Sequence, residues 1–281
     1  MNYRHAFHAG NFADVFKHAV LARIVAHLKE KPAAFRVIDT HAGAGLYDLA
    51  APEASRTAEW RDGIGKLVAA ELAPAARALL APYLDAVAAH NGERLAVYPG
   101  SPALVQSWLR PQDRLIACER EPAAARALMR RMRGDARVKA VEIDGYMALN
   151  AYVPPKERRG VVLVDPPFEQ PDEFDRLVDG LSRAYRKWPT GIYALWHPIK
   201  DARQSEGFGR RLARAGIARI LRAELTLPAR ADARLRASGL VLVNPPWKLE
   251  AELAILLPAL AQALAGKGRG AARLSWLAGE K

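Results

Sequence analysis

The chain has 281 residues, of which 51% are hydrophobic, enough to bury a substantial core in one α/β domain or two. Its single cysteine, Cys118, excludes an internal disulfide and a cysteine-based zinc site, as a reducing cytoplasm would permit. A formal net charge of +12 and a pI near 10 indicate a polyanionic partner, and nucleic acid is the commonest one.

The N-terminal stretch carries Arg4, Asp14, Lys17 and Arg23, where a signal peptide would have an apolar segment. No charge-free apolar run reaches the roughly 18 residues that are needed to span a bilayer. We therefore expect a cytoplasmic protein with no membrane partner.

The first element expected is a helix from about Phe12 to Lys29, with Asn11 as its N-cap. Short apolar, β-branched runs then alternate with helical patterns, which is typical of parallel βαβ units and predicts a doubly wound α/β sheet. The expected strands are Phe35 to Asp39, Arg114 to Glu119, Val138 to Ile143, Gly160 to Asp165, Ile192 to Trp196, Ala218 to Leu227 and Gly239 to Asn244.

Residues 46–98 have a different composition from the rest of the chain. They are rich in alanine, are interrupted by Pro52, Pro74 and Pro82, and lack strand-like runs. We interpret them as a small helical insertion subdomain, so that residues 1–45 and 99–281 form the main domain.

This insertion explains an unusual spacing. A dinucleotide-binding fold places its ribose-binding acid about 20 residues after the glycine turn, whereas Glu119 comes much later. Without the insertion, Ser101 to Leu109 becomes the crossover helix and Glu119 falls where it is expected. Gly100 and Ser101 should then lie beside the glycine turn.

That turn is the segment DTHAGAG at residues 39–45, directly after a strand. Gly43 and Gly45 allow a tight turn and a close approach to a ligand. The segment lacks the full G-x-G-x-x-G pattern, which disfavours NAD and favours a cofactor without a pyrophosphate. Taken alone, it is equally compatible with an ordinary strand-to-loop turn.

Acidic residues end the strands that follow. The carboxyl ends of parallel strands line one crevice, so Asp39, Glu119 and Asp165 should lie near one another. Glu119 can accept hydrogen bonds from ribose hydroxyls, Asp144 from an adenine amine, and the Gly145 amide can serve a ring nitrogen. Each could instead be a capping or surface residue, but their order along the chain favours a nucleoside-type cofactor.

The most specific motif is DPPF at residues 165–168, after the apolar run 161–164. An exocyclic adenine amine is a poor nucleophile, so its N–H groups must be drawn into directed hydrogen bonds. The Asp165 carboxylate and the Pro166 carbonyl can accept them. Phe168 offers a face on which a flipped base can stack.

A second loop, NPPW at residues 244–247, competes for the same role. The strand that precedes it, Gly239 to Asn244, follows Ala218 to Leu227 after a loop too short for a crossover helix. Such a pair is expected to be antiparallel. Asn244 should therefore emerge at the edge of the sheet opposite the cofactor, which leaves Asp165 as the catalytic candidate.

Together these motifs resemble class I methyltransferases of the N6-adenine kind. The N-terminal MNYRHAFHAGNFADVFKH (residues 1–18), THAGAG (40–45), PGSP (99–102) and NPPWKLE (244–250) resemble the RlmJ family of 23S ribosomal RNA adenine-N6 methyltransferases, essentially end to end. The resemblance implies S-adenosyl-L-methionine as cofactor and 23S ribosomal RNA, naked or partly assembled, as partner.

The resemblance also implies roles for individual residues. Asp165 would be the catalytic carboxylate, Tyr3 would place the target base, and His5 and Lys17 would lie close to the site. Phe168 departs from the tyrosine that is frequent here, which keeps base stacking but not a phenolic hydrogen bond. The expected cofactor-binding residues are Lys17, His18, His41, Gly43, Ser101, Glu119, Asp144, Gly145 and Asp165.

Several alternatives stay open from the sequence. The same fold could methylate another planar nitrogen, such as guanine N2 or a protein glutamine, or act on DNA adenine. It could also be a non-catalytic nucleic-acid-binding module, although such a module has no need of the acidic strand ends. His5 and His8 lack acidic or cysteine neighbours that would suggest a metal, and we expect none.

Arginines recur at helical spacing in two places, and each run could be a solvated face or a set of phosphate contacts. The two runs are Arg126, Arg130 and Arg133, and Arg210, Arg211 and Arg214.

Overall fold

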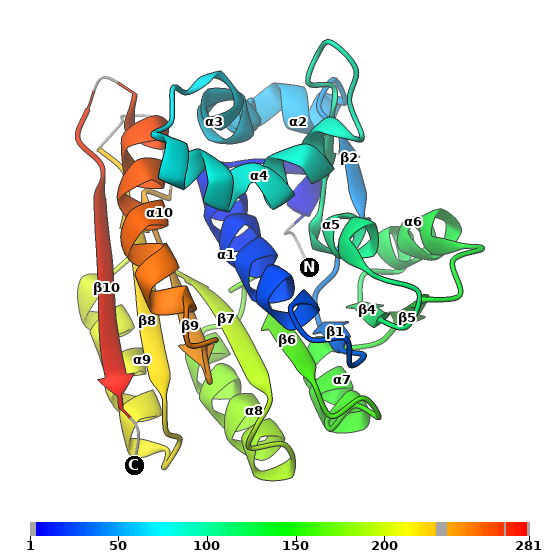
Figure 1. The fold of residues 1–281 in the computed structure, drawn as a ribbon, viewed down its shortest axis with the longest axis vertical. Coiled ribbons are helices and arrows are strands. Elements are labelled where there is room, and N and C mark those ends of the chain that lie inside the picture. The colour runs from blue at the N-terminus through cyan, green and yellow to red at the C-terminus, as the bar shows by residue number, and fades with distance from the viewer. Residues whose placement is uncertain (1–3, 229–234, 267, 280–281) are drawn as a thin grey trace.

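A computed structural model describes residues 4–228, 235–266 and 268–279 (Figure 1). Its central sheet has the strand order β10-β8-β9-β7-β6-β1-β4-β5. The sheet strands are β1 (Arg36–Asp39), β4 (Arg114–Glu119), β5 (Val138–Glu142), β6 (Gly160–Val164), β7 (Ile192–Pro198), β8 (Ile220–Thr226), β9 (Ala237–Val243) and β10 (Ala271–Ala278). All seven expected strands are therefore present, with ends shifted by two residues at most.

Strands β7, β6, β1, β4 and β5 are parallel neighbours. Helices cover both faces of this part of the sheet, so its central strands must be apolar on both sides. β6 meets this requirement, because all of its residues from Gly160 to Val164 are buried. The continuous apolar run in the sequence is thus the direct consequence of a central position in a parallel sheet.

The other edge of the sheet is antiparallel. β9 runs opposite to both β7 and β8, and Val243 at its end lies beside Tyr193 near the start of β7. Asp165 instead follows the far end of β6, which is parallel to β7. The expected placement of Asn244 at the edge opposite Asp165 is confirmed.

Two layers of helices enclose the sheet (Figure 1). α1, α5, α6 and α10 contribute to one apolar core, and α7, α8 and α9 to the core on the opposite face. The helices of these layers are α1 (Phe12–Lys29), α5 (Ser101–Trp108), α6 (Pro122–Met132), α7 (Gly145–Tyr152), α8 (Glu173–Lys187), α9 (Ala202–Arg214) and α10 (Leu249–Ala265).

The N-terminal helix α1 begins and ends where the sequence predicts. The Asn11 side chain accepts hydrogen bonds from the Ala13 and Asp14 amides, both at 3.0 Å, and so satisfies two otherwise unpaired N–H groups. α1 contacts α4, α5, α10 and the sheet. It is buried on nearly every side, charged residues included.

Residues 46–98 contain α2 (Pro52–Thr57), the π-helical turn η2 (Arg61–Gly65), α3 (Lys66–Ala69) and α4 (Pro74–Ala88). The expectation that they lack strands is wrong, because β2 (Leu46–Asp48) pairs antiparallel with β3 (Val97–Pro99). Strands of three residues are too short to show alternation in the sequence. Their pairing brings Gly100 beside the glycine turn as expected, with its amide 2.9 Å from the Gly45 carbonyl oxygen.

Strand β10 was not expected either. It lies at the edge of the sheet, where β8 is its neighbour, and its residues are exposed or half-buried. An edge strand of this kind lacks the apolar run that marks the central strands.

Asn244 provides a test of the turn that reverses the chain after β9. Its φ of 51° is left-handed, and its side-chain amide donates to the carbonyl oxygens of Pro189 (2.7 Å) and Gly191 (2.8 Å). We expect Asn244→Ala to lower the free energy of unfolding by about 2–3 kcal/mol, from two lost hydrogen bonds and left-handed strain. Asn244→Gly loses the same hydrogen bonds without the strain. Its free energy of unfolding, measured with urea, should therefore fall by about 1 kcal/mol less. Equal losses would contradict this account.

Candidate active site

A cavity of about 680 Å³ opens at the carboxyl ends of β1, β4 and β6. From β1 the chain proceeds to β4 and β5 on one side, whereas β6 and β7 lie on the other. In open α/β sheets such a switch point is where ligands bind, and the volume suits a nucleoside-sized molecule. The expected site residues that line it are His5, Lys17, His18, His41, Gly43, Ser101, Glu119, Asp144, Gly145 and Asp165.

Glu119 fixes the glycine turn to the end of β4. One carboxylate oxygen accepts from the Gly43 amide at 2.8 Å and the other from the Glu121 amide at 2.7 Å. Gly43 has a φ of +63°, and a side chain there would lie 2.1 Å from the Tyr47 hydroxyl. A residue with a side chain would therefore be strained in this turn. Glu119 keeps free lone pairs at the cavity.

Asp144 and Gly145, at the start of α7, also line the cavity. One oxygen of Asp144 caps α7 by accepting from the Tyr146 and Met147 amides, at 2.9 and 3.2 Å. A side chain on Gly145 would lie about 2.4 Å from the His41 ring. The glycine thus lets α7 approach the loop after β1 closely.

A buried acid, Asp39, and a buried hydroxyl, that of Ser101, meet beneath the cavity. Burial raises the pKa of Asp39 to about 7, against an opposing hydrogen bond from the Ser101 side chain. One Asp39 oxygen has no partner among the described residues. Asp39 and Ser101 therefore tie the end of β1 to the start of α5 beneath the cavity.

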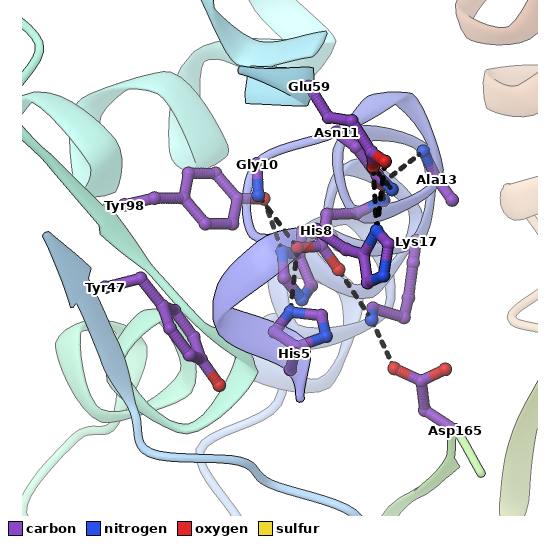
Figure 2. Close-up of polar contacts among 12 residues, drawn as sticks. His5, His8, Gly10, Asn11, Ala13, Lys17, Tyr47, Glu59, Tyr98 and Asp165 are labelled. Atoms are coloured by element: carbon purple, nitrogen blue, oxygen red, sulfur yellow. Dashed lines mark hydrogen bonds and ion pairs between the residues drawn. The ribbon is translucent and has the colours of Figure 1, made fainter. Parts of the chain in front are cut away.

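Lys17 holds the catalytic candidate in place. Its ammonium, 4% exposed, donates to Asp14 at 2.8 Å and also to Asp165 (Figure 2). Burial alone would lower the pKa of Lys17, but the two carboxylates outweigh it and raise the pKa well above its ordinary value. Lys17 is therefore a fixed positive charge against Asp165.

Asp14 is a residue that sequence analysis missed as part of the site. One of its oxygens accepts from Lys17, and the other accepts from the His5 ring and the Gly10 amide, both at 3.0 Å. Its pKa lies well below the ordinary value, because the charges of His5 and Lys17 outweigh burial. The spacing of Asp14 and Lys17, three residues apart on one helix, was the available signal.

Two expected residues, Pro166 and Phe168, are not among the residues that line the cavity. Phe168 packs edge-on against Phe174 and Trp196, with ring centroids 4.9 and 5.8 Å apart. Base stacking by Phe168 stays a prediction. Tyr3 lies outside the described residues.

The described part of the chain contains no group of three or more His, Cys, Asp or Glu side chains that could hold a metal. His8, one of the two histidines considered, instead contacts Glu59 at 3.0 Å. No helix in the described ranges is long and apolar enough to cross a membrane.

The fold and the cavity define a class of enzyme. Counted along the chain within the main sheet and leaving out β10, the strand order is 3-2-1-4-5-7-6 with the seventh strand reversed. This order, with a nucleoside-sized cavity after strands one and two, is that of class I methyltransferases. A crystal structure of a Legionella pneumophila protein matches with a TM-score of 0.87 and 31% identity, over 95% of this chain and 98% of that one.

The chain belongs to the RlmJ family. Residues 32–278 match the model of the family described as ribosomal RNA large subunit methyltransferase D, RlmJ. Relatives named ribosomal RNA large subunit methyltransferase J are 40% identical in Escherichia coli and 38% identical in Haemophilus influenzae, over the full length of both proteins in each case.

His5 gives the fold a pH dependence that can be measured. Burial disfavours its charged form, but the charge and hydrogen bond of Asp14 outweigh burial and raise its pKa above 6.5. The resulting stabilisation is complete below the unfolded pKa and is lost as pH rises through the folded one. We expect His5→Gln to lower the free energy of unfolding at about pH 6 and to lower it less at about pH 9.

His90 is the matched control, since burial lowers its pKa and the sign is reversed. The difference between wild type and His90→Gln should grow in favour of wild type as pH rises. A His5→Gln difference that is constant across the range would refute the pairing with Asp14.

Proposed function

We propose that the protein transfers a methyl group from S-adenosyl-L-methionine to the N6 amine of an adenine in 23S ribosomal RNA. The observation that carries this proposal is the position of Asp165. It follows β6, is held by Lys17, and lines the same cavity as Glu119 and Asp144. Membership of the RlmJ family and the names of its relatives support the same activity.

The residues present fit the cofactor. Glu119 and Asp144 offer acceptor oxygens to ribose and adenine, and Gly145 leaves room where any side chain would meet His41. A buried nitrogen of His18 at the cavity has no partner among the described residues. When bound, S-adenosyl-L-methionine supplies a methyl group made electrophilic by a positively charged sulfur.

The chemistry assigned to the protein is mainly positioning. Asp165 and the Pro166 carbonyl would accept the two N–H groups of the adenine amine and direct its lone pair. The proton becomes acidic only after the methyl group arrives, so no strong base is needed, and Asp165 can take it. Phe168 would stack on the base, which requires it to leave its contacts with Phe174 and Trp196.

Arginines stand beside the acidic residues of the cavity and on the adjoining helix α6. Arg4, Arg120 and Arg176 line the cavity, and α6 lines it with alanines while exposing Arg126 and Arg130. Contacts of this kind supply affinity that falls linearly with salt on a logarithmic scale. These arginines are the proposed phosphate contacts for ribosomal RNA, naked or partly assembled.

The catalytic assignment is tested with Asp165→Asn, which keeps the shape of the side chain but weakens its acceptors. We expect methyl transfer to ribosomal RNA to fall by at least about a hundredfold, with cofactor affinity within a few-fold of wild type. The measurement is transfer of tritiated methyl groups to RNA from cells lacking the enzyme. Asn244→Ala is the control, since it lies at the opposite edge and should retain transfer; the reverse result would move the catalytic role to residues 244–247.

The cofactor assignment is tested with Glu119→Ala and titration calorimetry. Loss of the ribose contacts and of the support for Gly43 should weaken S-adenosyl-L-methionine binding about tenfold or more, equivalent to about 1.4 kcal/mol. Glu142→Ala is the matched control, because Glu142 lies beside Glu119 in the register of β4 and β5 but does not line the cavity. Binding of NAD in place of S-adenosyl-L-methionine would refute the assignment.

A further inference from the structure

His18 is joined to a buried chain of hydroxyl groups. Its Nδ1 lies 2.7 Å from the Tyr98 hydroxyl, which lies 3.0 Å from the Tyr83 hydroxyl. Both tyrosines are fully buried and His18 is 1% exposed. The other nitrogen of His18, Nε2, has no partner among the described residues, and His18 lines the cavity.

The number of hydrogen atoms on these three groups determines which group donates in each hydrogen bond. Burial raises the pKa of both phenols and lowers the pKa of His18 to about 3, so each of the three groups carries one hydrogen near pH 7. The two hydrogen bonds use two of them. The third lies at one end of the chain, because a Tyr98 hydroxyl that accepted both bonds would leave its own hydrogen buried without a partner among the described residues.

The two ends differ in how many buried polar groups they leave unpaired. Nε2 of His18 has no partner among the described residues in either arrangement. The Tyr83 hydroxyl makes no other hydrogen bond with the described residues, so a hydrogen left there would add a second buried, unsatisfied donor. Tyr83 therefore donates to Tyr98, and Tyr98 donates to Nδ1 of His18. The hydrogen of His18 is then on Nε2, a buried atom of a residue that lines the cavity.

The second histidine that lines the cavity, His41, is held in the opposite tautomer. The Thr40 hydroxyl lies 2.9 Å from the Leu163 carbonyl oxygen and 2.8 Å from Nδ1 of His41. The Leu163 carbonyl can only accept, and it also accepts from the Thr40 amide at 3.0 Å. Both short contacts of the Thr40 hydroxyl are therefore hydrogen bonds only if its single hydrogen goes to Leu163 and His41 donates from Nδ1. Burial lowers the pKa of His41 to about 4, which leaves its Nε2 without a hydrogen.

We propose that these two hydroxyl networks hold His18 and His41 in opposite tautomers, so that the cavity presents one imidazole N–H donor and one imidazole acceptor. A ligand with both a carboxylate and N–H groups satisfies both. Resting on the proposed function, the inference assigns His18 to the carboxylate of S-adenosyl-L-methionine and His41 to one of its N–H groups.

Tyr83, Tyr98 and Thr40 are then positioning residues, because none of them lines the cavity. Tyr83 belongs to α4 and Tyr98 to β3, both within residues 46–98. Residues 46–98 thus reach the cavity through this hydrogen-bond chain as well as through Tyr47, which lines the cavity directly.

The tautomers are measured in the protein without cofactor. Long-range proton–nitrogen spectra of protein labelled with ¹⁵N-histidine distinguish Nδ1–H from Nε2–H, and His18→Gln and His41→Gln assign the two signals. We expect His18 to carry its hydrogen on Nε2 and His41 on Nδ1. The same tautomer at both positions, or the reverse pair, would overturn the proposal.

Substitutions then test whether the Tyr98 and Thr40 hydroxyls set the two tautomers. Tyr98→Phe removes only the hydroxyl that donates to His18 and should leave a mixture of its tautomers. Tyr193→Phe is the matched control, because that buried hydroxyl donates to Ala184 and Trp188 in another part of the core. Thr40→Val should release His41 from the Nδ1–H form, and Thr40→Ser should restore it. Unchanged spectra in Tyr98→Phe and Thr40→Val would refute the proposed cause.

Calorimetry relates the tautomers to the ligand, with S-adenosyl-L-methionine and its decarboxylated analogue as probes. Wild type should bind the first more tightly, and Tyr98→Phe should lose roughly tenfold for it while changing little for the analogue. An equal loss for both probes would count against a carboxylate at His18. Predicted tautomers without binding of either probe would refute the proposed function alone, whereas normal binding with the wrong tautomers would refute this inference alone.

Discussion

The ammonium of Lys17, buried between the carboxylates of Asp14 and Asp165, connects the N-terminal helix to the loop after β6. A buried cation is stable only with partners, and removing one carboxylate leaves an uncompensated charge. α1 must therefore lie where Lys17 can reach β6, and this position in turn brings His5 and His18 to the cavity. The site depends on a contact between segments that are distant in the sequence.

Residues 46–98 support that contact from the opposite side. Glu59 accepts from the Asn11 side chain at 3.0 Å and contacts His8, so it fixes the turn that precedes α1. The Ile64 amide donates to the Gly10 carbonyl at 2.9 Å. The insertion therefore positions the N-terminal residues of the site, which is a physical reason for its place between β1 and β4.

The sequence predicted the parts of the fold that leave a local pattern. Central strands such as β6 are continuous apolar runs, and the N-cap Asn11 precedes a helical period, so both were found. β2, β3 and β10 were not, because short or edge strands are stabilised by partners far along the chain and carry little pattern of their own.

The same limit applies to the site. Residues at strand ends, such as Glu119 and Asp165, could be inferred because parallel strands bring their carboxyl ends together. Tyr98 could not, since its importance comes from burial beside particular partners, and the only signal for Asp14 was its spacing of three residues from Lys17. Phe168 shows the opposite case: the motif suggested a base-stacking face, whereas the structure packs the ring against Phe174 and Trp196.

Strand direction separates two loops that the sequence alone makes nearly equivalent. Both consist of an acceptor side chain, two prolines and an aromatic residue after a buried strand, and both contain one residue with a φ of 51°, Phe168 or Asn244. Asp165 emerges at the carboxyl edge of the parallel strands and meets Lys17. Asn244 emerges at the opposite edge, where its side-chain amide donates hydrogen bonds to the carbonyl oxygens of Pro189 and Gly191. The chemistry available to such a motif therefore depends on the orientation of the strand that carries it.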